Sequence, residues 1–184
     1  PQTVWVSEEV LLDLADTQTP QGIVAVIQKE EVGLPDFRQG KFLFLEDVQD
    51  PGNVGTMIRT ADAAGFTGVI VSDKSADIYS LKTLRSMQGS HFHLPIYRMS
   101  LVPFIAEAKK NNLPILATTL SRDSKDYREL SPLENFALVM GNEGQGISPI
   151  MAESANQLVH IGMKGRAESL NVAVAAGILM FYFS

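Results

Sequence analysis

The amino-acid sequence predicts an α/β protein in which helices cover both faces of a mostly parallel β-sheet. From Lys41 onward, short apolar runs that are typical of buried strands alternate with amphipathic patterns that are typical of helices. Hydrophobic residues make up 45% of the 184 residues and charged residues 20%, a balance typical of an ordered domain with a full core. These features indicate one α/β domain over residues 41–184.

Strands are expected where a run is short, apolar and bounded by polar residues, glycine or proline. The runs are Phe42–Leu45, Gly68–Val71, Leu94–Tyr97, Pro114–Thr118, Phe136–Met140 and Gln157–Ile161. Helices are expected where apolar residues recur at helical spacing. They are Asn53–Ala64, Ser80–Met87, Leu101–Asn111, Ile147–Ser154 and Ser169–Phe183.

Residues 1–40 show a different pattern. A short strand, a helix over Glu8–Ala15 and a second strand over Gly22–Gln28 are expected there. They are followed by a polar, turn-rich stretch, Glu30–Pro35, that resembles a linker. We therefore place a domain boundary near Gly40.

The composition excludes several kinds of chemistry. The chain has no cysteine, which rules out disulfides, zinc–thiolate sites and a cysteine nucleophile. The net charge of −6 argues against a broad phosphate-binding surface but leaves room for a local basic patch. His91 and His93 alternate in a strand-like run, yet no carboxylate at a suitable spacing completes a site, so no metal is expected.

The sequence also predicts the compartment. The longest mostly apolar run, Leu170–Phe183, is too short to cross a bilayer. The first residues show neither the basic region nor the apolar core of a signal peptide. A cytoplasmic protein with no membrane contact is expected.

The first candidate for chemistry is the segment Asp50–Asp62, which opens with a Pro-Gly turn after a predicted strand. Its apolar residues form one helical stripe, so Arg59 and Asp62 lie off the buried face. In the simplest interpretation Asn53 caps the helix and Arg59 pairs with Asp62, which adds roughly a few tenths of a kcal/mol. The alternative is a ligand site, because open α/β sheets bind ligands where strands end.

Two further segments follow predicted strand ends. Gly141–Gly146, of sequence Gly-Asn-Glu-Gly-Gln-Gly, offers open backbone and one carboxylate, although such turns are about as often purely structural. Ile161–Asn171 leads into the last helix. Ser169 or Glu168 is the simplest cap for that helix, while the amide of Asn171 needs partners.

Together these segments resemble the motifs of a known family. Asn53-x-Gly55-x-x-x-Arg59, Gly141-x-Glu143-x-x-Gly146-x-Ser148 and Ser169-Leu170-Asn171 are similar, in order and spacing, to the three motifs of SpoU-type (TrmH-like) RNA 2′-O-ribose methyltransferases of the SPOUT class. The resemblance covers the chain from about Lys41 to the C-terminus. It implies a C-terminal trefoil knot, S-adenosylmethionine bound in the knot as methyl donor, and a homodimer that completes the active site.

The resemblance also implies roles for individual residues. It assigns Gly141, Ile161 and Leu170 to S-adenosylmethionine binding, with Thr119, Leu120 and Met163 as additional walls. It assigns Asn53, Arg59, Glu143, Ser169 and Asn171 to catalysis and substrate positioning. Arg59 is the family's proposed general base. Because a guanidinium with a pKa above about 12 holds its proton, we expect Arg59 to clamp a phosphate and orient the hydroxyl instead.

A weaker resemblance concerns the RNA. Val4–Gln28 is similar to the last part of the small α/β RNA-substrate-binding domain that precedes the catalytic domain in many members, so residues 1–40 are interpreted as a remnant of that domain plus a linker. This favours ribosomal RNA over transfer RNA. The alternatives are a tRNA 2′-O-methyltransferase and a catalytically silent, knotted RNA-binding dimer. A nucleotide-binding oxidoreductase is disfavoured, because Gly141–Gly146 lacks the Gly-x-Gly-x-x-Gly order.

Overall fold

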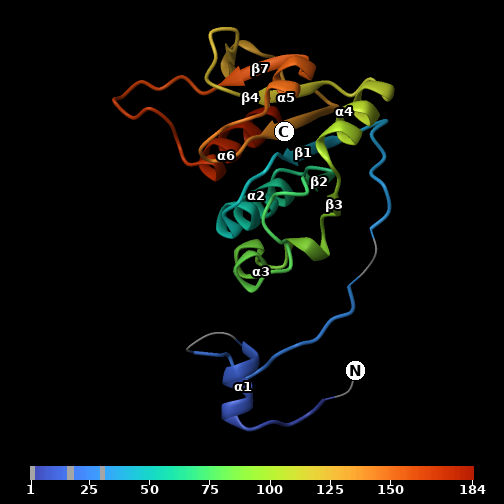
Figure 1. Cartoon of the computed structure of the whole chain (residues 1–184), viewed down its shortest axis with the longest axis vertical. Coiled ribbons are helices and arrows are strands. Elements are labelled where there is room, and N and C mark those ends of the chain that lie inside the picture. The colour runs from blue at the N-terminus through green and yellow to red at the C-terminus, as the bar shows by residue number, and fades with distance from the viewer. Residues whose placement is uncertain (1–2, 16–18, 30–31) are drawn as a thin grey trace. The chain divides into compact units, whose positions relative to one another are not determined.

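A parallel β-sheet forms the centre of the chain from Val32 onward (Figure 1). The computed structural model describes residues 3–15, 19–29 and 32–184, and it divides into two units, Pro1–Glu31 and Val32–Ser184. Within the described residues the sheet has seven strands in the order β3-β2-β1-β6-β4-β7-β5, and every neighbouring pair is parallel. The predicted α/β class with a largely parallel sheet is confirmed.

The strands follow the apolar runs of the sequence closely. They are β1 (Lys41–Leu45), β2 (Gly68–Val71), β3 (Ile96–Arg98), β4 (Ile115–Thr118), β5 (Lys125–Asp126), β6 (Phe136–Met140) and β7 (Gln157–His160). The central strands are buried on both faces, which is why they read as continuous apolar runs. β5 has no counterpart among the predicted strands, because two polar residues at a sheet edge give no apolar signal. The strand predicted over Leu94–Tyr97 begins later, at Ile96.

The helices alternate with the strands as predicted. They are α2 (Pro51–Ala63), α3 (Leu81–Met87), α4 (Leu101–Lys110), α5 (Pro149–Ser154) and α6 (Val172–Phe183), with short 3-10 helices η1 (Ser90–Phe92) and η2 (Tyr127–Glu129). The prediction that Asn53 caps α2 is wrong: Pro51 occupies the first turn, and the Asp50 side chain accepts the N–H of Asn53 at 2.9 Å. No helix in the described chain is long and apolar enough to cross a membrane.

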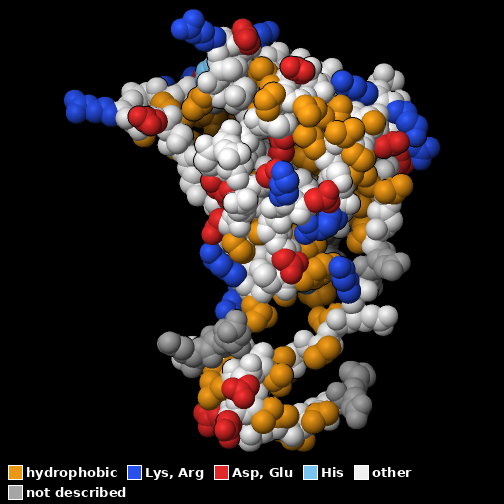
Figure 2. Space-filling model, in the orientation of Figure 1, with side chains coloured by type: hydrophobic (Ala, Val, Ile, Leu, Met, Phe, Trp, Pro, Cys, Tyr) orange, Lys and Arg blue, Asp and Glu red, His pale blue; other side chains and the backbone are white. Residues whose placement is uncertain are grey.

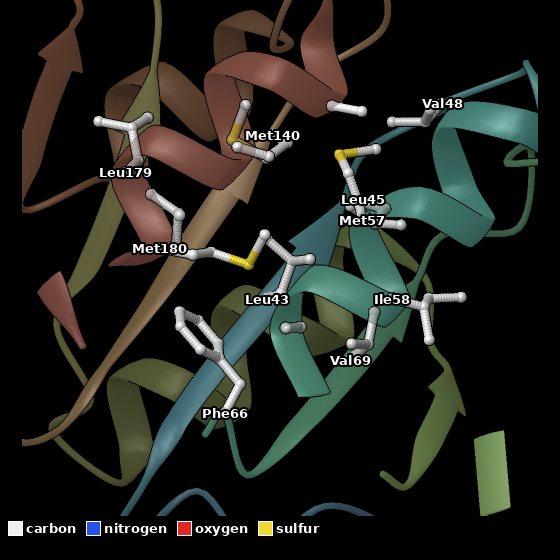
Figure 3. Packing of buried hydrophobic residues seen from close by; sticks show 14 of the residues in the cluster. Leu43, Leu45, Val48, Met57, Ile58, Phe66, Val69, Met140, Leu179 and Met180 are labelled. Atoms are coloured by element: carbon white, nitrogen blue, oxygen red, sulfur yellow. The ribbon is translucent and has the colours of Figure 1, made fainter. Parts of the chain in front are cut away.

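The sheet carries one apolar cluster on each face, because successive side chains of a strand point to opposite sides. On one face, Leu43 and Leu45 pack with side chains of α2 and α6 (Figure 3). On the other, Phe42 and Phe44 pack against α4, where Phe44 stacks on Phe104 with 4.1 Å between ring centroids. Helices therefore cover both faces, as predicted.

The unit Pro1–Glu31 contains one helix in its described residues, α1 (Glu8–Ala15), with the predicted bounds. The two strands predicted in this segment, before α1 and over Gly22–Gln28, are absent from the described residues. A strand needs a neighbour to pair with, and no described strand lies in this unit. Large apolar side chains are exposed here, including Trp5 at 94% and Val26 at 99%.

The linker predicted before Gly40 is described only in part, since Glu30 and Glu31 lie outside the described residues. Phe37 is 2% exposed, and its ring meets those of Phe42 and Phe104 edge-on. Residues shortly before β1 therefore belong to the core of the unit Val32–Ser184. The interpretation of residues 1–40 as a remnant of an RNA-substrate-binding domain plus a linker stays a prediction.

The two histidines do not share a strand face. His91 lies in η1 and His93 follows it, so the predicted alternation over this run is wrong. His93 Nδ1 lies 3.5 Å from the Asp62 carboxylate, whereas the buried His91 Nδ1 has no hydrogen-bond partner in the described chain. Among residues 3–15, 19–29 and 32–184, no group of three or more potential ligands is arranged to hold a metal ion.

Candidate active site

The carboxyl ends of four neighbouring strands meet at one edge of the sheet. Leu45 at the end of β1 lies beside Met140 at the end of β6, and Thr118 of β4 lies beside Val159 of β7. The segments that follow β4, β6 and β7, together with α6, surround a cavity of about 450 Å³. This is where open α/β sheets bind ligands.

The residues predicted to bind S-adenosylmethionine all line this cavity. They are Thr119, Leu120, Gly141, Ile161, Met163 and Leu170. Glu143 and Ser169 line it as well, whereas Asn53, Arg59 and Asn171 do not. The volume lies within the range of small-molecule sites, roughly 300–1,000 Å³, and loop backbone combined with apolar walls suits a nucleoside. The residues present fit the cofactor, and their individual roles stay predictions.

The glycine-rich loop after β6 is a closed turn held by Asn142. Asn142 and Gly146 exchange backbone hydrogen bonds of 3.0 and 2.9 Å, and the Asn142 side-chain oxygen accepts from the N–H groups of Gly144 (2.9 Å) and Gln145 (3.0 Å). Gly146 has a φ of 70°, which favours glycine. A Cβ on Gly141 would overlap the backbone of Gly146. The loop itself therefore requires glycine at position 141.

Replacing Gly141 with alanine is expected to destabilise the protein by roughly 1–3 kcal/mol, because the backbone of Gly146 cannot withdraw without breaking its bonds to Asn142. Thermal unfolding measures the effect. Gly165→Ala is the matched control, since a Cβ there meets nothing within 4 Å. An unchanged melting temperature in Gly141→Ala would show that the loop can move aside.

Asn53, Glu143 and Asn171 form one hydrogen-bonded chain beside the cavity. Asn53 Nδ2 donates to Glu143 Oε1 at 3.1 Å, and Asn171 Nδ2 donates to Asn53 Oδ1 at 3.1 Å. Glu143 also accepts from the backbone N–H groups of Gln49 at 3.2 Å and Asp50 at 3.1 Å. The structure thus brings together predicted catalytic residues from all three motifs.

The Glu143 carboxyl group is held in its ionised form. Partial burial raises the pKa of Glu143, but hydrogen bonds from Asn53 and from backbone N–H groups, including those of Asp50 and Gln49, lower it by more. Its pKa therefore lies below the ordinary value. Near neutral pH the group is an acceptor of hydrogen bonds and carries no proton to donate.

Arg59 lies exposed on α2. No hydrogen bond or ion pair to Arg59 occurs within the described chain. The pairing with Asp62 considered in the simplest interpretation does not form, and the Asp62 carboxylate lies against His93 instead. The guanidinium is therefore available to an external anion.

Asn171 caps α6. Its side-chain oxygen accepts from two backbone N–H groups of the first turn, at 2.9 and 3.3 Å, while its Nδ2 bonds Asn53. The prediction that Ser169 or Glu168 caps this helix is wrong, because the helix begins at Val172 and Asn171 is the adjacent residue. Ser169 is instead exposed at the cavity.

A long loop joins β7 to α6 and reaches far out from the sheet (Figure 1). Its residues from Lys164 to Asn171 are exposed, and Figure 2 shows a basic side chain at its outermost point. The loop carries Lys164 and Arg166, and it borders the cavity through Met163 and Leu170. Positive charge therefore lies near the cavity of an acidic chain, which suits a ligand that carries phosphate.

Sequence reasoning missed two features of the site. The donors from Gln49 and Asp50 to Glu143 are backbone groups, which leave no mark in the side-chain pattern. The Asn142 side chain, besides closing its own loop, donates to the carbonyl of Asp47 at 2.8 Å. An asparagine inside a glycine-rich turn was the available signal, because asparagine side chains commonly bond nearby backbone.

The fold and the site define an α/β protein that has a cavity of small-molecule size where parallel strands end. Polar residues from three separate segments lie beside this cavity. Residues 40–181 match the SpoU rRNA Methylase family. Because this match covers most of the chain, the chain belongs to that family.

Several relatives and solved structures that the chain resembles are named as RNA-modifying enzymes. The 23S rRNA (guanosine(2553)-2'-O)-methyltransferase RlmP of Bacillus subtilis is 44% identical over 181 residues, which are 98% of this chain and 72% of that protein. An AdoMet-bound rRNA methyltransferase from Sinorhizobium meliloti matches with a TM-score of 0.87 at 36% identity, over 96% of this chain and 69% of that one. The A. aeolicus TrmH/SpoU tRNA modifying enzyme matches with a TM-score of 0.70 at 34% identity, over 77% of this chain and 72% of that one. The prediction of a SpoU-type RNA 2′-O-methyltransferase that uses S-adenosylmethionine is confirmed.

Proposed function

We propose that this chain transfers the methyl group of S-adenosylmethionine to a ribose 2′-hydroxyl of ribosomal RNA. The observation that carries the proposal is the hydrogen-bonded chain of Asn53, Glu143 and Asn171 beside a cavity of about 450 Å³. A methyl donor in the cavity would lie next to a ribose bound at Asn53, Glu143 and Asn171. Proximity supplies much of the rate when the donor is already activated.

Each polar residue has a distinct task in this proposal. The cofactor supplies a methyl group activated by its sulfonium sulfur, and the residues that line the cavity hold it. Glu143 fixes Asn53, because its carboxylate already accepts three N–H donors and its lowered pKa makes it a poor proton acceptor. Asn171 Nδ2 holds the side-chain oxygen of Asn53. Ser169 faces the substrate. Arg59 binds phosphate and orients the hydroxyl, since its guanidinium retains its proton.

Ribosomal RNA is the proposed substrate class. The B. subtilis relative, at 44% identity, is named for a 23S rRNA guanosine, whereas the tRNA modifying enzyme of A. aeolicus matches at 34% over less of the chain. Transfer of labelled methyl to each RNA in turn separates the two substrates. No transfer to either, with the cofactor bound, would instead support the silent RNA-binding dimer.

We propose that two copies of the chain associate through α6. One side of the helix is buried in the core, whereas Val174, Ile178 and Phe181 are 53%, 37% and 59% exposed. These three residues are four and three positions apart, so they form one stripe. Exposed apolar stripes mark interaction surfaces. We propose a second copy of the protein as the partner of this stripe. Asn171, at the start of the same helix, belongs to the proposed catalytic residues, so a dimer formed here would lie beside the active site.

We also propose that the C-terminal part is tied in a trefoil knot, as the resemblance implies. The Tyr182 hydroxyl, near the end of α6, donates to the carbonyls of Leu130 at 3.1 Å and Arg128 at 3.3 Å. Its ring packs edge-on against Tyr127 with 4.8 Å between centroids. The last helix is thus bonded to the segment between β5 and β6. This contact is consistent with a C-terminal helix that passes through an earlier loop, as a trefoil knot requires.

The unit Pro1–Glu31 is proposed to be part of a small RNA-substrate-binding domain. Its exposed Trp5 and Val26 support this, because apolar side chains of that size need a surface to cover them. The cytoplasm stays the proposed compartment.

Calorimetry with S-adenosylmethionine tests the cavity. Leu170→Asp places a charge against an apolar wall and is expected to weaken binding about tenfold or more. Leu133→Asp is the matched control, because both leucines are 37% exposed and only Leu170 lines the cavity. Equal affinity in the wild type and both variants would remove the cavity from the proposal. Binding of a nicotinamide nucleotide in place of S-adenosylmethionine would overturn the function.

A further inference from the structure

The turn between β1 and α2 contains a residue in an uncommon backbone conformation. Asp47 has a φ of 55°, in the left-handed region. Residues with a Cβ avoid this region, asparagine and aspartate least. Such a conformation persists where surrounding contacts enforce it.

Two buried serines in the segment that follows β2 hold the conformation of this turn. The N–H of Asp47 donates to Ser72 Oγ at 2.8 Å, and Ser72 Oγ donates to Asp47 Oδ1 at 2.7 Å. Ser75 Oγ accepts from the N–H of Val48 at 3.1 Å and donates to the carbonyl of Leu45 at 3.1 Å. Ser72 is 3% exposed and Ser75 7%, so these bonds are costly to leave unmade.

The same turn is bonded to both parts of the candidate active site. The carbonyl of Asp47 accepts from Asn142 Nδ2 at 2.8 Å, and Asn142 closes the glycine-rich loop beside the cavity. The next N–H groups, of Gln49 and Asp50, donate to Glu143. The turn therefore links the cavity loop to the start of α2, which carries Asn53.

We propose that Asp47 is a positioning residue, whose left-handed conformation, locked by Ser72, aims the N–H groups of Gln49 and Asp50 at Glu143. Aspartate meets two requirements here, since it tolerates a positive φ and supplies the oxygen that Ser72 bonds. Asparagine meets both as well, and alanine meets neither. The catalytic consequence of this role rests on the proposed function, whereas the positioning itself does not.

The pKa of Glu143 reports the positioning without any methyl transfer. In the wild type it is expected below the ordinary value, because of the donors that surround the carboxylate. In Asp47→Ala and in Ser72→Ala it is expected to rise toward the ordinary value, since two of those donors turn away. Asp47→Asn is expected to keep the wild-type value, and so is Ser90→Ala, a buried serine at 5% exposure outside this turn. Carboxyl resonances followed by NMR through a pH titration give all of these values.

Kinetics then test the consequence. Asp47→Ala and Ser72→Ala are expected to lower kcat about tenfold, with the KM for RNA within about twofold, because Glu143 and Asn53 are displaced while Arg59 keeps its place on α2. Asp47→Asn should restore the wild-type kcat. If Asp47→Ala does not fold, Ser72→Ala decides alone.

Two outcomes would overturn the inference: a Glu143 pKa and kcat unchanged in both Asp47→Ala and Ser72→Ala, or an Asp47→Asn variant as impaired as Asp47→Ala. Failure of the wild type to methylate RNA would instead count against the proposed function. In that case the titration of Glu143 still decides whether Asp47 positions it.

Discussion

Replacing Arg59 with alanine is expected to lower methyl transfer at least about a hundredfold, while the affinity for S-adenosylmethionine stays within about twofold. Arg59 is exposed, has no partner in the described chain and does not line the cavity, so its loss should leave the cofactor undisturbed. What is lost is the charge that, in the proposed function, holds the RNA phosphate. Single-turnover transfer of labelled methyl, together with calorimetry, measures both quantities.

Arg59→Lys is expected to recover only part of the rate. A guanidinium holds a phosphate with two parallel hydrogen bonds, whereas an ammonium acts as a point charge on a flexible stem. Lys109→Ala on α4 removes one exposed positive charge elsewhere and should leave the rate unchanged. Wild-type transfer by Arg59→Ala would reduce this arginine to an ordinary helix-surface residue.

The second large effect is expected at α6, where Phe181→Glu should turn the proposed dimer into monomers and abolish most methyl transfer. Phe181 is 59% exposed and ends the stripe that begins at Val174. A glutamate there would place an unpaired charge in an apolar interface, which is strongly unfavourable. Sedimentation at micromolar concentration should give a mass near twice 20.1 kDa for the wild type and near 20.1 kDa for the variant.

Val102→Glu is the control for that change. Val102 is 63% exposed on α4, so the same substitution adds the same charge at a surface outside the stripe. It should remain a dimer with wild-type activity. A monomeric wild type, or a Phe181→Glu monomer that is fully active, would contradict an active site shared between two copies.

The strands of the sheet could be predicted because burial on both faces leaves a continuous apolar run. Gly68–Val71 and Phe136–Met140 have the predicted bounds for this reason. Their order in the sheet could not be read from any local pattern, since β1 lies between β2 and β6, and β6 comes much later in the chain. The residues that cap the helices could not be predicted either. Several residues able to cap a helix stand close together at these two helix starts, and in the structure Asp50 and Asn171 are the caps.

The candidate site could be located from three motifs, but its internal contacts could not. Glu143 was predicted at the site by its place in the glycine-rich loop, whereas its partners are backbone groups whose positions depend on the conformation of Asp47. A left-handed aspartate has no signature in the sequence. The pairing of Arg59 with Asp62, one of two interpretations considered from the sequence, does not form, and the residue that does lie against Asp62, His93, is distant in sequence.

The bond between Asn53 and Asn171 spans 118 positions of the chain, which has a consequence for biosynthesis. On the ribosome the first motif emerges long before the third, and the helix that Asn171 caps also supplies the buried residues Ala173, Ala176, Leu179, Met180 and Phe183. Docking of α6 onto the sheet therefore completes the hydrophobic core and also joins the first motif to the last. A nascent or half-folded chain has neither, so under the proposed function methyl transfer is expected to begin only when folding is complete.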